Sequence, residues 1–117
     1  MLIYLASPYT VKDPKATVQA MKNRRTRRFE KVCRKAAELM MIPGNKVFCP
    51  IAHSHSIEVN GMGVLMEAAF WLEQDFAILT YVDKLVVYRM EGWKESEGIK
   101  KEIEFATGLK IPIEYID

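Results

Sequence analysis

The stretch that decides the fold is LIYLASPYT, residues 2–10. Its first five residues form an almost unbroken hydrophobic run, which is typical of a strand buried on both faces of a parallel sheet. Ser7-Pro8 ends the run, because proline lacks an N–H donor and restricts the residue before it. Further hydrophobic runs at residues 46–49, 84–88 and 111–116 predict three more strands.

Helical segments are expected between these strands, over residues 14–41, 64–80 and 96–107. Residues 51–63 contain both histidines and several turn signals, and are expected to form a loop. The alternation of strands and helices predicts an α/β fold: a small doubly wound, Rossmann-like parallel sheet of four to five strands with helices on both faces. Pro112 predicts that the last strand lies at an edge of the sheet.

The length of 117 residues predicts a single domain over residues 1–117, and 50% of the residues are hydrophobic. No hydrophobic run approaches the roughly 20 residues that cross a bilayer, so no membrane partner is expected. The first residues include no basic segment of the kind that opens a secretion signal. Because two cysteines cannot form a disulfide framework, a reducing cytoplasm is the expected location.

The net charge of +2 hides a basic segment, residues 12–35, which holds ten Lys and Arg against two acidic residues. Basic density of this kind can attract nucleic acid or phosphate. A helix with a basic, solvated outer face accounts for the pattern as well. Nucleic acid is not the expected partner, because no aromatic platform that could read bases accompanies the charges.

Ligands of doubly wound folds bind beyond the carboxyl ends of the strands, which selects residues 7–10, 50–63 and 90–98. In the last of these segments, Ser96 is a good N-cap and Gly98 lets an anion approach the first-turn amides. Asp75 lies among hydrophobic neighbours, where an acid is costly unless it is paired or has a task. An ordinary N-cap and a helix-face ion pair are the alternatives at these positions, and Asp83 is expected to be a turn or cap residue.

One cysteine and two histidines, which are typical zinc ligands, lie close together in the segment Cys49-Pro50-Ile51-Ala52-His53-Ser54-His55. Its ligand spacing matches no closed four-ligand set, so no metal is expected. Instead, one histidine is expected to bind polar groups of a substrate while the other packs or stays in water.

Together these motifs resemble the nucleoside 2-deoxyribosyltransferase-like superfamily, over nearly the whole chain. The layout is similar to small proteins that begin Ile-Tyr-Leu-Ala-Ser-Pro-Tyr and carry Pro-Ile-Ala-His-Ser-His, which are residues 3–9 and 50–55 here. It is similar also to the nucleoside deoxyribosyltransferases and the 2′-deoxynucleoside 5′-phosphate N-hydrolases. Their catalytic glutamate follows a glycine by four residues, as Glu102 follows Gly98. The resemblance implies that Glu102 is the nucleophile, that Tyr4 orients it and that Asp75 protonates the departing base.

One position distinguishes the two activities. Six residues before the glutamate the transferases carry an aspartate, whereas the hydrolases carry a serine that binds the 5′-phosphate, and this chain has Ser96. A hydroxyl at a helix N-terminus suits a phosphate, which a carboxylate would repel. The hydrolases also carry an arginine in the loop after the first strand, and this chain has none at residues 6–10. Lys100 or an arginine of the long helix is therefore the candidate source of the positive charge that would bind the phosphate.

The resemblance therefore implies an N-glycosidase that hydrolyses the base–sugar bond of (deoxy)nucleoside 5′-monophosphates through a glutamate nucleophile, without metal or organic cofactor. A nucleoside 2-deoxyribosyltransferase and a non-catalytic nucleotide-sensing module are the alternatives. The residues expected to bind the substrate are Ser7, Pro8, Tyr9, His53, His55, Ser96 and Gly98. A homodimer or higher homo-oligomer is expected as well, with Met66, Phe70 and Trp71 as candidates for either the core or the interface.

Overall fold

The computed structural model describes residues 1–61 and 67–117. Within them four strands pair in parallel in the order β2-β1-β3-β4: β1 (Leu2–Ala6), β2 (Lys46–Phe48), β3 (Lys84–Tyr88) and β4 (Ile113–Ile116). The predicted parallel α/β sheet is thus confirmed. β4 lies at an edge, as Pro112 immediately before it predicts.

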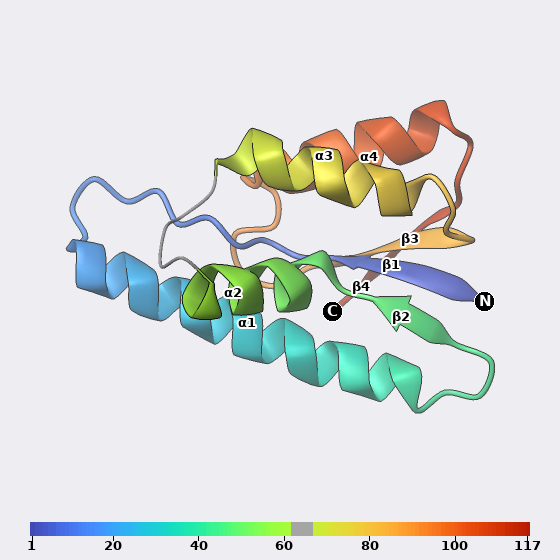
Figure 1. Ribbon diagram of the computed structural model, residues 1–117, viewed down its shortest axis with the longest axis horizontal. Coiled ribbons are helices and arrows are strands. Elements are labelled where there is room, and N and C mark those ends of the chain that lie inside the picture. Colours follow the sequence, from blue (N-terminus) through green and yellow to red (C-terminus); the bar gives the residue numbers. More distant parts are fainter. Residues whose placement is uncertain (62–66) are drawn as a thin grey trace.

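Helices cover both faces of the sheet (Figure 1). α1 (Val18–Met40) and α2 (Pro50–Asn60) lie on one face, while α3 (Ala68–Leu79) and α4 (Glu97–Gly108) lie on the other. The chain runs outward from β1 to β2 and then returns past β1 to β3. The direction of winding therefore reverses at β1, and the carboxyl ends of β1 and β3 border the crevice where such folds bind ligands.

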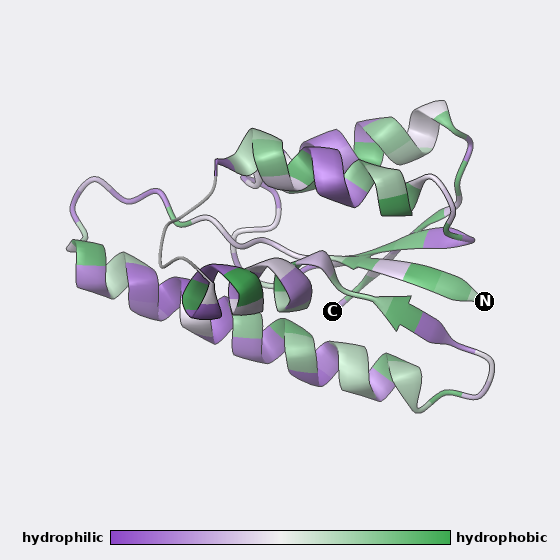
Figure 2. Ribbon diagram, in the orientation of Figure 1, coloured by the Kyte–Doolittle hydropathy of each residue, from purple (hydrophilic) through white to green (hydrophobic). Residues whose placement is uncertain are grey.

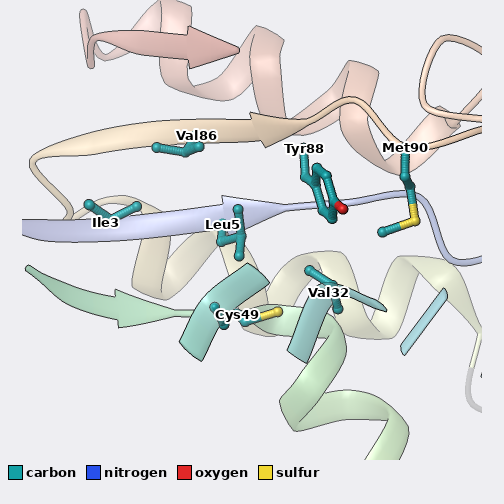
Figure 3. Packing of buried hydrophobic residues seen from close by; sticks show 8 residues of the cluster. Ile3, Leu5, Val32, Cys49, Val86, Tyr88 and Met90 are labelled. Atoms are coloured by element: carbon teal, nitrogen blue, oxygen red, sulfur yellow. The ribbon is translucent and has the colours of Figure 1, made fainter. Parts of the chain in front are cut away.

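The side chains of β1 alternate between two hydrophobic clusters. Ile3 and Leu5 join the cluster beneath α1, which also contains Val32 of that helix and Val86 and Tyr88 of β3 (Figure 3). Tyr4 and Ala6 join the cluster beneath α3 and α4. Because both faces of β1 are covered, its sequence is hydrophobic throughout. Figure 2 shows this mainly hydrophobic strand beside helices in which hydrophilic and hydrophobic residues alternate.

The expected loop over residues 51–63 is wrong for residues 51–60, which belong to α2. Pro50 takes the first helical position, where a missing N–H costs nothing. The Gly61 N–H donates to the carbonyl oxygen of Ile57 at 2.7 Å, so Asn60-Gly61 marks the end of a helix rather than a turn within a loop. The Gly63 signal lies outside the described residues.

The other helices differ from expectation mainly at their beginnings. α1 begins at Val18 rather than near Pro14, because the Thr17 hydroxyl caps it by accepting from the Ala20 N–H at 3.0 Å. α3 begins at Ala68, and the expected start at Val64 lies outside the described residues. Asp83 lies in the turn between α3 and β3, as one of its two expected roles, and its carboxylate accepts from the Leu2 N–H of β1 at 2.6 Å. No helix in the described ranges is both long and apolar enough to cross a membrane.

Candidate functional site

A cavity of about 680 Å³ opens at the carboxyl ends of β1 and β3. Its walls come from the segment after β1, from one side each of α1, α2 and α3, and from the segment that leads into α4. All three segments that the fold rule selected therefore contribute to it. The residues of the sequence-based site that line it are Ser7, Tyr9, Asp75, Ser96, Gly98 and Glu102.

Glu102 of the cavity wall forms a buried polar contact with Tyr4, which does not itself line the cavity. Glu102 is only 5% exposed on α4, and Tyr4 is fully buried on the face of β1 that α4 covers. The Tyr4 hydroxyl donates a hydrogen bond to Oε2 of Glu102. Burial raises the pKa of Tyr4 well above 10, so this hydroxyl keeps its proton and acts as the donor.

Burial also sets the protonation of the two acids in the cavity. It raises the pKa of Glu102 to about 8, against the opposing effect of the hydrogen bond from Tyr4. Asp75 on α3 is 7% exposed, and burial raises its pKa to about 7. The charge of Asp75 raises the pKa of Glu102 further, so the two groups influence each other's ionisation. Near neutral pH the pair can hold a single proton, as acid-assisted displacement by a carboxylate requires.

The ion-pair alternative for Asp75 finds no support, because Asp75 forms no ion pair within the described parts of the chain. The alternative for Ser96, an ordinary N-cap, is confirmed, but it does not describe the whole position of this residue. Its hydroxyl caps α4 by accepting from the Ile99 N–H at 3.2 Å, and the same residue lines the cavity. A Cβ at Gly98 would meet no atom nearer than the Ser96 hydroxyl at 3.8 Å, so a ligand can approach the first turn of α4.

Three arginines of α1 also line the cavity. The interpretation of the basic segment as a purely solvated helix face did not predict this. The three arginines are Arg24, Arg25 and Arg28. Their spacing of one and four residues places them on one side of the helix, and this spacing was the available signal. Lys100, the other proposed source of charge, is exposed near Glu97 at 3.5 Å and does not line the cavity.

Arg28 is the best fixed of these cations. Its Nη1 donates to the carbonyl oxygen of Thr10 at 2.9 Å and to that of Tyr9 at 3.4 Å. Gly92 has a φ of 93°, and a Cβ there would collide with the guanidinium group. Burial and the neighbouring charge of Arg24 lower the pKa of Arg28, which indicates that like charges are held together beside the cavity.

The structure separates the two histidines from the cavity wall. His55 is buried behind Tyr9, with its Nδ1 2.7 Å from the Tyr9 hydroxyl and its ring stacked on Phe29 at 4.0 Å. Its burial lowers its pKa, so the ring is neutral near pH 7 and orients Tyr9. His53 is exposed beside the Trp71 ring and lies outside the wall, as does the fully buried Pro8.

The helix over residues 50–60 explains why other residues of this segment, and not its histidines, line the cavity. Pro50, Ser54 and Glu58 recur every four residues and face the cavity, whereas His53 and His55 fall on other sides. The same period on α3 brings Trp71 and Asp75 to the cavity.

Sequence reasoning missed Glu58 because the segment was expected to be a loop. Its Oε1 accepts from the Trp71 indole N–H at 2.5 Å. Trp71 lines the cavity wall, while Phe70 beside it is 41% exposed. Met66, the third interface candidate, lies outside the described residues.

Two buried polar atoms of the wall have no hydrogen-bond partner among the described residues: the Ser7 hydroxyl and Oε2 of Glu58. Such atoms are rare in folded proteins, so each needs a physical account. In residues 1–61 and 67–117 no cluster of His, Cys, Asp and Glu could hold a metal ion.

Comparison with curated proteins returned no match. A family model described as "Domain of unknown function (DUF1937)" matches residues 1–116. The match covers nearly the whole chain, including every element of the sheet and of the cavity wall. The chain therefore belongs to the DUF1937 family.

Proposed function

We propose that this protein is an N-glycosidase that hydrolyses the base–sugar bond of nucleoside 5′-monophosphates. The observation that carries the proposal is the buried Glu102 carboxyl, which accepts a hydrogen bond from Tyr4 and shares a cavity with Asp75. The sequence resemblance implies this activity, and the chemistry of the cavity supports it on separate physical grounds.

Cleavage of an N-glycosidic bond develops positive charge at C1′ of the sugar and negative charge on the base. In the proposed first step, ionised Glu102 forms a bond to C1′ while the bond from C1′ to the base nitrogen breaks. The bonding electron pair leaves with the base, which takes the proton of Asp75. In the second step Asp75 removes a proton from water, and the resulting hydroxide displaces Glu102 from C1′.

This sequence needs one proton on the pair of acids, and that proton must be on Asp75. The pKa values of about 8 for Glu102 and about 7 for Asp75 mean that the pair holds one proton between these two pH values, shared between the two carboxyls. Two features favour the proton on Asp75 rather than on Glu102. The Tyr4 hydroxyl stabilises ionised Glu102, and the positive charge that develops at C1′ does the same.

The arginines of α1 and the first turn of α4 supply the features that a 5′-phosphate requires. Arg28 and Arg24 provide charge-assisted donors, and Gly98 leaves access to the N-terminus of α4. The unpartnered Ser7 hydroxyl, at the end of β1, supplies a further donor or acceptor. These groups support a nucleotide rather than a nucleoside as substrate.

The proposal is tested by incubating the protein with deoxynucleoside 5′-monophosphates and measuring free base by chromatography. Glu102→Gln is expected to lower base release by roughly a thousandfold or more, because an amide cannot act as the nucleophile. Glu104→Gln is the matched control: Glu104 is exposed on the same helix, and its replacement should leave the rate unchanged. Circular dichroism and thermal melting of each variant verify folding.

The same experiment separates the alternatives. Free sugar phosphate must appear in step with free base. If a second base added to the mixture is incorporated and no sugar phosphate forms, the protein is a transferase. If nucleotides raise the melting temperature but no base is released, the protein is a binding module, and hydrolysis is ruled out.

A further inference from the structure

Glu58 is a buried acid of the cavity wall that the proposed cleavage does not use. It is 8% exposed on α2 and forms no ion pair within the described residues. Its Oε1 is occupied by the Trp71 indole N–H at 2.5 Å, while its Oε2 is buried without a partner among those residues. A buried carboxylate oxygen without a donor is costly, so within residues 1–61 and 67–117 this oxygen is left available to a donor from a ligand.

The position of Glu58 relative to Asp75 indicates which part of a nucleotide supplies that donor. Trp71 precedes Asp75 by one helical turn on the cavity side of α3, and it holds Glu58 through its indole N–H. In the proposed reaction Asp75 gives its proton to the base. The flat Trp71 side chain and the Glu58 carboxylate therefore lie next to where the base must sit.

We infer that Glu58 accepts a hydrogen bond from an exocyclic amino group of the base, so that the cavity selects amino-bearing bases over their oxo counterparts; this inference rests on the proposed function for the placement of the base. An amino group donates to a carboxylate, whereas a carbonyl oxygen at the same ring position repels it. The terminal torsion of a glutamate is broad, so the carboxylate can rotate to present Oε2 to a ligand.

The test compares matched nucleotides that differ by an amino-to-oxo exchange: deoxycytidine with deoxyuridine 5′-monophosphate, and deoxyadenosine with deoxyinosine 5′-monophosphate. Binding is measured by isothermal titration calorimetry in the Glu102→Gln background, so that turnover does not consume the ligand. The amino-bearing member of each pair is expected to bind about tenfold more tightly or better.

Adding Glu58→Gln should reduce this ratio by about tenfold or reverse it, because the glutamine amide can donate to the oxo group. Glu73→Gln is the matched control, since Glu73 is exposed on α3 and does not line the cavity. Trp71→Phe is a second variant that removes the indole donor, and it should reduce the same ratio because Glu58 loses its orientation.

An unchanged ratio in Glu58→Gln, or an equal loss of affinity for all four nucleotides, overturns the inference and makes Glu58 a structural contact of Trp71. If none of the four nucleotides binds, the inference fails as well. Affinity tests this inference and base release tests the proposed function, so the two proposals are judged by different measurements. Amino-selective binding without base release leaves this inference standing and removes the hydrolase, whereas base release without selectivity removes this inference alone.

Discussion

Replacing Glu102 by Gln should make the folded protein more stable than the wild type at pH 8. Burial raises the pKa of this carboxyl from 4.5 to about 8. Between these values the unfolded chain has released the proton that the folded protein still holds. The folded state therefore binds more protons than the unfolded state, and stability falls as pH rises through this window. Glutamine keeps an oxygen for the Tyr4 hydroxyl and has no proton to lose.

The size of the effect follows from the two pKa values. Each pKa unit corresponds to about 1.4 kcal/mol, so the penalty that Glu102 imposes reaches about 4 kcal/mol at pH 8. Below about pH 4.5 it vanishes, because the carboxyl is then protonated in both states. Small domains unfold at a cost of about 5–15 kcal/mol, so a change of this size is readily measured.

The assay is urea unfolding followed by tryptophan fluorescence at pH 4.5, 6 and 8. The stability advantage of Glu102→Gln over wild type should grow from about zero at pH 4.5 to about 4 kcal/mol at pH 8. Both proteins retain the smaller pH dependence due to Asp75, whose pKa burial raises to about 7. The exposed Glu104→Gln variant should follow the wild type at every pH. A Glu102→Gln variant that is less stable than wild type at pH 8 would refute the reasoning.

Three further predictions concern the proposed reaction. Arg28→Gln should weaken the binding of a deoxynucleoside 5′-monophosphate by roughly 10- to 100-fold, because it removes a charge-assisted donor. The affinity for the parent deoxynucleoside should not change. Calorimetry measures both affinities, and an equal loss of affinity for the two ligands would mean that Arg28 only supports the loop carbonyls of residues 9 and 10. In the wild type, kcat/KM for base release should be highest between pH about 7 and about 8, since the pair is doubly protonated below this range and doubly ionised above it. Tyr4→Phe removes the hydrogen bond that lowers the pKa of Glu102, so it should reduce the maximum by roughly tenfold and move the alkaline limb to higher pH. Initial rates over pH 5.5–9.5 test this, and an unchanged profile would contradict the role of Tyr4.

Much of the fold was predictable because the signal is local. The runs at residues 2–6 and 84–88 are hydrophobic at every position or nearly so, which only a strand covered on both faces requires. Proline before the final strand predicts its edge position, because an edge tolerates a missing donor. The segment at residues 51–60 was less predictable. Its helix has little amphipathic contrast and mixes polar residues with a glycine end signal that loops share.

The candidate site was predictable only in part. A family resemblance selected Tyr4, Asp75 and Glu102, and the structure brings Tyr4 into a hydrogen bond with a residue 98 positions away. His53 has the composition of a site residue, but a helix turns it to the solvent. Glu58 carries no distinguishing neighbours in the sequence, because its partner Trp71 comes from another helix.

The sequence by itself determined the four strands and three of the four described helices, and where most of these end, because hydrophobic period, proline and capping residues act over a few neighbours. Only the tertiary structure decided that three arginines of α1 face the same cavity as two acids of α3 and α4. It also decided that the Glu58 carboxylate meets an indole N–H of the neighbouring helix. The reason is physical: the burial, pairing and ionisation of a charged group depend on which elements pack across the sheet from it. No local pattern records that arrangement.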